Sequence, residues 1–163
     1  MPAPPKTPPT ALARGAKLAA RREHTAADLA RKLRRKGHAG EEVSAAMETL
    51  REKGYVNDER AAAAYVEERQ RKGFGPRRIA MELARLGVSR ETARAALDAL
   101  YSAEQEHEIL GRLIERAPAA QRADADKLAQ KLLRRGFRAD AIRSALAGVD
   151  DEMGDLLEFP AGD

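Results

Sequence analysis

The sequence predicts an all-α protein made of three tandem three-helix repeats that stack into an elongated, curved, solenoid-like molecule. Two observations predict this fold class. The 163 residues include 34 Ala and 17 Leu but only 5 Val, 4 Ile and 5 Thr, and this composition favours helices over strands. One pattern of apolar residues around a glycine also occurs three times along the chain. Alanine-rich cores bury little area, so each repeat needs its neighbours for stability.

The repeat is anchored on Gly37, Gly87 and Gly136. Before each glycine, two leucine or isoleucine residues four positions apart predict a helix. After each glycine, apolar residues have the i, i+3, i+4, i+7 spacing of one buried helical stripe. A glycine suits the junction because it reaches positive φ without strain. The three stripes are Val43, Ala46, Met47 and Leu50; Ala93, Ala96, Leu97 and Leu100; and Ile142, Ala145, Leu146 and Val149.

A further helix precedes each of these pairs, at residues 10–22, 57–72 and 103–117. Asn57 is a good N-cap for the second of them, and Asp58 is a structural acid in its positive first turn. On the first helix, the predicted buried face holds Leu12, Ala16 and Ala19 or Ala20.

These helices complete three repeats, at residues 10–53, 54–102 and 103–149. Residues 1–9 contain five prolines and predict a disordered leader, and residues 150–163 predict an acidic, flexible tail. The tail holds six acids and no base, so the net charge of +4 becomes +10 without it. A basic body suggests an acidic or polyanionic partner, although a solvated surface of mixed charge has the same composition. Folding of the tail onto the basic body is a weaker hypothesis than a solubilising terminus.

The composition also excludes several classes of function. The chain has no Cys, and therefore no disulfide, thiolate metal site or cysteine nucleophile. Apolar runs are too short for a membrane span, and a secretory signal is missing, so we expect a cytoplasmic protein. His24 and His107 stand in charged segments that we expect at the surface, and His38 occupies a packing position between helices. The sequence therefore predicts neither an enzyme nor a metal or cofactor site.

A longer motif carries a resemblance. The segment GYVNDER at residues 54–60 continues with Ala62, Tyr65-Val66, Arg69, Lys72-Gly73, Gly75, Arg78-Ile79, Glu82-Leu83 and Gly87-Val88. This central unit resembles the RecX family of recombinase regulators. Residues 29–37 and 131–137 are similar to the first and third repeats of that family. Ala61 departs from the family pattern, which usually has an aromatic residue there, and the leader and tail are not part of the pattern.

The resemblance implies a protein of tandem three-helix repeats that binds the RecA filament on DNA. It implies inhibition of ATP hydrolysis, strand exchange and co-protease activity in DNA repair and the SOS response. DNA is then a weak, non-specific partner, reached mostly through the filament, and a monomer is the default state.

Basic residues are the candidate contacts with the filament or its DNA. The strongest are Arg77 and Arg78, because cations in the first turn of a helix are unfavourable unless they serve another purpose. Cations before the repeat glycines also complement helix C-termini, which is a structural explanation for them. Phe74 and Tyr55 are expected to pack at turns. The candidate set is Lys72, Arg77, Arg78, Arg69, Arg71, Arg34, Arg35, Lys36, Arg134 and Arg135.

Two alternatives remain open. The helices on either side of Gly87 imitate a helix-turn-helix, in which Arg90 and Arg94 of the second helix would contact DNA bases. The chain would then be a DNA-binding transcription regulator. The third possibility is a generic helical scaffold.

Overall fold

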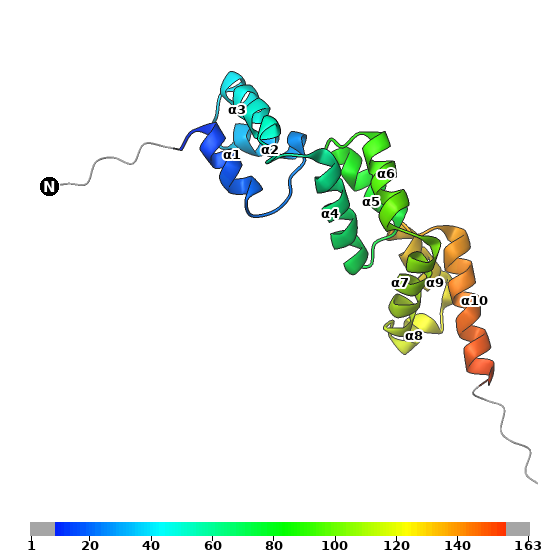
Figure 1. The fold of residues 1–163 in the computed structure, drawn as a ribbon. Coiled ribbons are helices and arrows are strands. Elements are labelled where there is room, and N and C mark those ends of the chain that lie inside the picture. Colours follow the sequence, from blue (N-terminus) through cyan, green and yellow to red (C-terminus); the bar gives the residue numbers. More distant parts are fainter. Residues whose placement is uncertain (1–8, 156–163) are drawn as a thin grey trace, which may run out of the picture. The chain divides into compact units, whose positions relative to one another are not determined.

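The computed structural model describes residues 9–155 (Figure 1), and in this part of the chain it contains ten helices and no strand. The predicted all-α fold class is therefore confirmed. The helices are α1 (Ala11–Ala19), α2 (Ala26–Arg35), α3 (Gly40–Glu52), α4 (Asp58–Arg71), α5 (Pro76–Arg85), α6 (Arg90–Leu100), α7 (Ala103–Glu115), α8 (Ala119–Arg122), α9 (Ala125–Arg134) and α10 (Ala139–Asp155).

The observed helices follow the sequence pattern with two differences. The short helix α8 was not expected; it begins after Pro118, which occupies its N-cap position. The last helix, α10, continues to Asp155, past the predicted boundary at residue 149. The rest of the predicted tail, residues 156–163, and residues 1–8 of the predicted leader lie outside the described residues.

The described chain divides into two compact units. The first contains the residues up to Tyr65 together with Leu83–Ala93, and the second contains Val66–Glu82 and the residues from Arg94 onward. Helices α4, α5 and α6 therefore contribute residues to both units.

In the first unit, α1 packs against α2 and α3. The core is formed by Leu29 and Leu33 of α2 with the predicted stripe of α3. On α1 the predicted face is only partly right: Ala16 packs, partly buried, against the core, but Leu12 is exposed, and Ala11 and Gly15 are the buried residues. A Cβ atom at Gly15 would lie 2.6 Å from Leu50 Cδ1. The helices therefore approach so closely that only the smallest side chains fit between them, which hydrophobic periodicity alone does not reveal.

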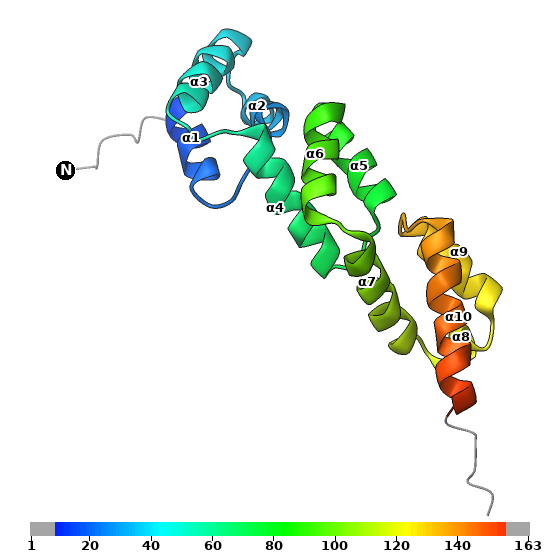
Figure 2. The ribbon, with the colours of Figure 1, turned by 45° about the vertical axis from the view of Figure 1, so that its right-hand side comes forward.

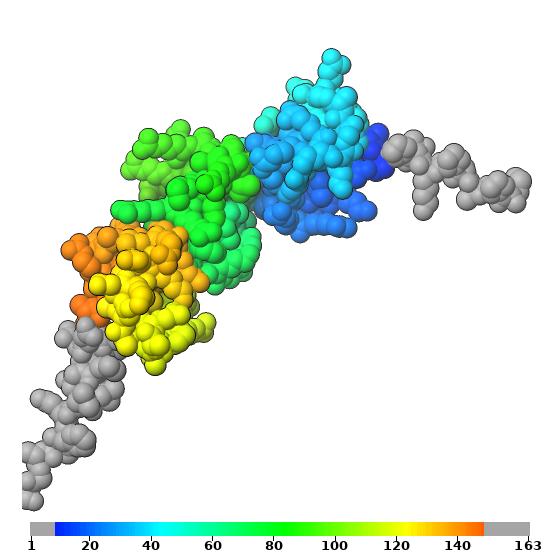
Figure 3. All heavy atoms as spheres, turned by 180° about the vertical axis from the view of Figure 1, so that it is seen from behind, coloured from blue at the N-terminus to red at the C-terminus, as the bar shows by residue number. Residues whose placement is uncertain are grey.

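In the second unit, α10 packs against α7 and α9, and the ribbons of α7 and α10 lie side by side in Figures 1 and 2. Phe137, between α9 and α10, is fully buried among these helices' apolar stripes. Figure 3 shows α8 and α9, in yellow and orange, packed together without a gap. The buried residues of the stripes include Ile109, Leu110 and Ile114 on α7, Leu128 and Leu132 on α9, and Ile142 on α10.

Three carboxylates satisfy backbone N–H groups at helix starts distant in sequence. Glu42 Oε1 accepts a 2.7 Å hydrogen bond from the N–H of Ala11, and Asp58 Oδ1 accepts one of 2.7 Å from the N–H of Ala26. Glu106 Oε1 accepts a 3.0 Å hydrogen bond from the N–H of Arg138, just before α10. A negative charge at a helix N-terminus is favourable. Asp58 is thus structural, as expected, but it also stabilises a helix other than its own.

His24 differs from the prediction, because it is buried rather than at the surface. Its Nδ1 lies 3.1 Å from Asp28 Oδ2, and Lys32 Nζ lies 2.5 Å from the same oxygen. Burial lowers the pKa of His24, although the hydrogen bond with Asp28 opposes this effect. Burial alone would raise the pKa of Asp28, but hydrogen bonds from Lys32, His24 and Arg31 lower it to about 2. The charged residues near His24 in the sequence predicted an exposed segment. In the fold, Asp28 forms ion pairs with Arg31 and Lys32, so these charges compensate one another.

Candidate functional site

The main candidate site is an open groove of about 630 Å³ in the second unit, which we call the basic groove. Helix α7 forms one wall, and the end of α4 and the α9–α10 turn contribute the others. Gly73, Ile109 and Leu113 supply its apolar surface, and Gln70 and Gln105 supply uncharged polar groups. Its cations are Arg71, Lys72, Arg112, Arg116 and Arg135.

The charge of the basic groove is strongly one-sided. Glu108 is the only carboxylate among its described lining residues, and it lies 3.4 Å from Arg112 in an exposed ion pair. Lys72 forms an ion pair with Glu68, one helical turn earlier, and both side chains are well exposed. Exposed pairs of this kind contribute at most about 1 kcal/mol, so an incoming anion can replace the carboxylate at little cost.

Arg135 joins the parts of the groove. Its Nη1 donates hydrogen bonds of 3.0 Å to the carbonyl of Gly73 and 3.5 Å to that of Lys72. These carbonyls lie just beyond the C-terminal end of α4, where a cation complements the helix dipole. Arg135 therefore holds the end of α4 in place, in addition to lining the groove.

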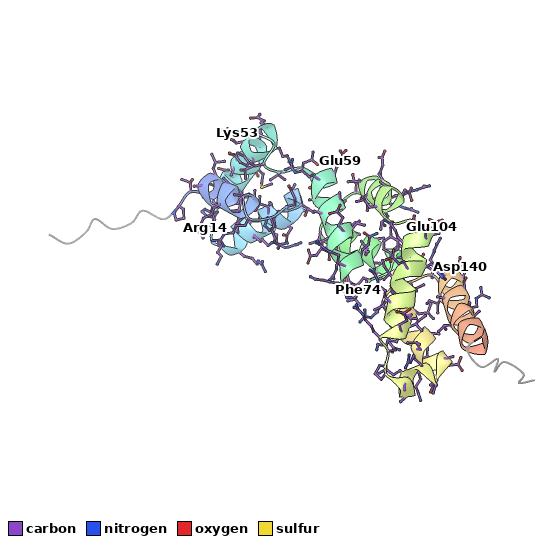
Figure 4. All side chains as sticks on the ribbon, turned by 60° about the horizontal axis from the view of Figure 1, so that its bottom comes forward. Arg14, Lys53, Glu59, Phe74, Glu104 and Asp140 are labelled. Carbon is purple, nitrogen blue, oxygen red and sulfur yellow. The ribbon has the colours of Figure 1, made fainter. Side chains whose placement is uncertain are left out.

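Beside the groove, three of the predicted site residues, Arg69, Arg78 and Arg135, surround Phe74, which is labelled in Figure 4. The guanidinium Cζ atoms of Arg69 and Arg78 lie 4.5 Å and 4.4 Å from the ring centroid. Both also bind Glu82: Arg69 Nη2 at 2.6 Å and Arg78 Nε at 3.0 Å from Oε1. The unfavourable position of Arg78 in the first turn of α5 is thus compensated within the fold, so it does not by itself require a ligand.

The start of α5 is anchored on the α9–α10 turn. The N–H of Gly75 donates a 2.8 Å hydrogen bond to the carbonyl of Arg135, and the N–H of Arg77 donates one of 3.1 Å to the carbonyl of Gly136. The side chain of Arg77 is exposed. This anchoring brings residues 69–78 and 134–136, which are far apart in sequence, to one side of the second unit.

The remaining predicted residues lie elsewhere or apart from the groove. Arg134 is exposed on the last turn of α9 and does not line it. Arg34, Arg35 and Lys36 are exposed at the end of α2 in the first unit. Arg35 and Lys36 line a separate, smaller groove there.

Sequence reasoning missed Arg112 and Arg116 of α7. They are four positions apart, and this spacing places both on one helix face. The spacing was visible in the sequence, but it gave no sign that this face meets the end of α4 and Arg135. It also missed Glu106, which is buried beside Arg138 at 2.8 Å.

The chemistry of the basic groove is that of anion binding. Arginine guanidinium groups pair with carboxylates and phosphates through parallel hydrogen bonds. Among residues 9–148, whose side chains the structure describes, no three His, Cys, Asp or Glu side chains gather closely enough to hold a metal ion. In the described part of the chain, no helix has the length and hydrophobicity of a membrane span.

Comparison with known proteins identifies relatives along most of the chain. Residues 57–97 match the family model described as RecX, second three-helix domain. A regulatory protein RecX from Halorhodospira halophila is 39% identical over 142 residues, covering 83% of this chain and 86% of the relative. The regulatory protein RecX from Chromobacterium violaceum is also 39% identical, over 144 residues, covering 86% and 91%.

The fold agrees with solved structures as well. The chain is similar to a crystal structure of RecX from Lactobacillus salivarius with a TM-score of 0.71 and 24% sequence identity, covering 86% of this chain and 97% of that one. The matched relatives share more than a third of their residues with this chain over most of both lengths, and the helical fold is the same. The chain therefore belongs to the RecX family.

Proposed function

We propose that this protein binds RecA–DNA filaments in the cytoplasm and restrains RecA, including its ATP hydrolysis, strand exchange and co-protease activity. The resemblance of the central repeat and the family membership support this function. The structural observation that carries it is the basic groove, in which three segments far apart in sequence bring five cations together. Such a surface attracts an acidic protein face or DNA phosphates, and the attraction weakens as salt is added.

The proposed mechanism is bridging. Separate repeats, acting within a monomer, contact neighbouring RecA protomers, and several weak contacts add up because the second is formed at a high effective concentration. A bound bridge opposes the motion that each ATP cycle requires. DNA contributes weak, non-specific contacts.

Within this mechanism, the exposed cations of the basic groove are the principal contacts. Arg71, Lys72, Arg112 and Arg116 have side chains open to solvent. Arg77 remains a proposed contact because it is exposed in the first turn of α5 without the stacking on Phe74 that Arg78 has. Arg69, Arg78 and Arg135 position the groove through Glu82 and the end of α4. Arg34, Arg35, Lys36 and Arg134 are secondary contacts.

A transcription regulator is the less favoured alternative. Arg94, one of the two residues that would contact bases, lies 3.3 Å from Asp98 on the same exposed face of α6. A carboxylate on that face repels DNA phosphates. No observation in the structure favours base recognition by α6.

The test is RecA's DNA-dependent ATP hydrolysis on single-stranded DNA, using the cognate RecA, with this protein titrated in. The groove variant combines Arg112→Gln with Arg116→Gln, and the control combines Arg51→Gln with Lys53→Gln, which removes two exposed cations from the end of α3. We expect the groove variant to need about tenfold more protein for half-inhibition, equivalent to about 1.4 kcal/mol, and the control to match the original protein.

The stoichiometry separates two modes of action. Inhibition far below one copy per RecA protomer indicates capping or spreading disruption, and inhibition near one copy indicates coating of the filament. Equal inhibition by the groove variant and the original protein would refute the role of the groove. If active RecA is unaffected at every ratio, the proposed function is wrong.

A further inference from the structure

The smaller groove in the first unit is also basic, and the RecA proposal uses only Arg35 and Lys36 of its lining, as secondary contacts. It has a volume of about 380 Å³ and lies between α1 and α2, which pack against each other. We call it the α1–α2 groove. Its described lining consists of Arg14, Leu18, Lys32, Arg35 and Lys36, so it holds four cations and no carboxylate.

Arg14, labelled in Figure 4, distinguishes this groove from an ordinary solvated surface. Its Nε atom is buried and has no hydrogen-bond partner among the described residues. A buried donor without an acceptor is costly, and a charged donor more so. Arg14 is the fourth residue of α1 and lies before the last turn of the helix, which contains Lys17. The C-terminal helix dipole, which explains cations at the end of α2, therefore does not explain Arg14.

The other cations of the groove come from one face of α2. Lys32, Arg35 and Lys36 have i, i+3, i+4 spacing and so are neighbours on the helix surface. Lys32, which lines the groove, donates from Nζ to Asp28 Oδ2 at 2.5 Å, and Asp28 itself is not among the described lining residues. Asp28 also forms hydrogen bonds with Arg31 and His24, so its single negative charge does not neutralise Lys32 completely. Arg35 and Lys36 have exposed side chains that can turn toward an anion.

We propose that the α1–α2 groove is a phosphate-binding site, with the Arg14 guanidinium as its central group. A tetrahedral phosphate group has enough oxygens to accept from a guanidinium and from several ammonium or guanidinium groups at once. It offsets the mutual repulsion of the four cations. A free phosphate and the phosphodiester of a nucleic acid share this chemistry. The inference does not depend on the proposed function, because it concerns a different groove and its test contains no RecA.

The experiment follows the arginine Nε–H signals of the full-length ¹⁵N-labelled protein by NMR at constant ionic strength. Inorganic phosphate is added in one series and a short oligo-dT in the other. The Arg14→Lys variant, which keeps the charge but lacks Nε–H, identifies the Arg14 signal. The signal of Arg51, an exposed residue at the end of α3, is the internal control.

We expect a saturable shift of the Arg14 signal and of backbone amides between residues 32 and 36, with Arg51 unmoved. The Arg14→Gln variant should bind the same probe about tenfold more weakly or worse, as expected for a lost charge-assisted hydrogen bond, while Arg51→Gln should bind normally. A response to both probes or to phosphate alone supports a site for free phosphate, and a response to oligo-dT alone supports a nucleic-acid backbone contact. The proposal is overturned if neither probe shifts the Arg14 signal, or if Arg51 shifts as much. Since the signals are read on the original protein, a poorly folded variant does not prevent this decision.

Discussion

The hydroxyl of Thr25 donates a 2.6 Å hydrogen bond to the carbonyl of Leu86, the residue before the junction Gly87. Gly75 lies fifty residues after Thr25, at the corresponding position of the next repeat. Its N–H donates a hydrogen bond to the carbonyl of Arg135, the residue before the junction Gly136. Both donors stand directly before a helix, α2 in one case and α5 in the other. The start of one helix is thus fastened to a later interhelical turn by equivalent contacts. This relationship makes the turns more sensitive to substitution than ordinary surface loops.

Replacing Thr25 by Val should lower the free energy of unfolding by about 2–3 kcal/mol. Thr25 is buried, and its Oγ1 also accepts from the N–H of Asp28 at 3.1 Å as the N-cap of α2. The variant loses this cap and leaves the carbonyl of Leu86 without its donor. Urea denaturation measures the change. Thr25→Ser keeps the hydroxyl and should cost less than 1 kcal/mol. An equal loss in both variants would show that the methyl group contributes as much as the hydrogen bonds.

Substitution of the junction glycines should depend on position. Gly37 and Gly136 have similar φ values of +88° and +90°, so alanine is strained at both. A Cβ at Gly37 meets open space, whereas one at Gly136 would lie 2.4 Å from the backbone N of Arg78. Gly37→Ala should therefore cost about 1–2 kcal/mol, and Gly136→Ala a further 1–3 kcal/mol. Thermal and urea unfolding of the two variants provide the comparison, and equal losses would contradict the close contact at Gly136.

Removal of Arg138 alone should lower the free energy of unfolding more than removal of both Arg138 and its ion-pair partner Glu106. Glu106 is almost fully buried, and Arg138 Nε donates to its Oε2 at 2.8 Å. Arg138→Ala leaves this carboxylate with the backbone N–H of residue 138 and should cost about 3 kcal/mol. The double variant Glu106→Leu with Arg138→Ala removes the buried charge as well, so it should be more stable than Arg138→Ala alone. Denaturant midpoints test the order, and a double variant at or below the stability of the single one would show that Glu106 does not need Arg138.

The contribution of Asp28 to stability should depend on pH. Its pKa is lowered from the usual 3.8 to about 2 in the folded state by hydrogen bonds from Lys32, His24 and Arg31. Because the folded pKa is the lower one, the stabilisation is present above pH 3.8 and is lost as the pH falls toward 2. Asp28→Asn should therefore be less stable than the original protein at pH 6, and the difference should shrink between pH 4 and pH 2. Urea midpoints measured across this range provide the test, and a constant difference would mean that Asp28 acts through packing rather than charge.

The spacing of apolar residues in the sequence was sufficient to predict the positions of most of the helices. Apolar spacing located α2, α3, α9 and the start of α10, since a buried stripe repeats with the period of the helix itself. It was incomplete on α1, where the predicted Ala16 packs against the core but Leu12 is exposed and Gly15 is buried against Leu50. The distance between two helices depends on both of their surfaces together, so the spacing within one helix cannot predict it.

The sites depended still more on tertiary structure. The sequence by itself determined the family, the all-α fold class and the excess of basic residues, because these follow from composition and from motifs that are continuous in the chain. Only the fold decided that Arg71, Lys72 and Arg135 share a groove with Arg112 and Arg116, while Arg69 and Arg78 stack on Phe74. It likewise buried Glu106 and His24 beside partners that neutralise or hydrogen-bond them. Whether a charge meets solvent, an ion-pair partner or another cation is decided by residues far away in sequence, so it is settled only when the helices pack.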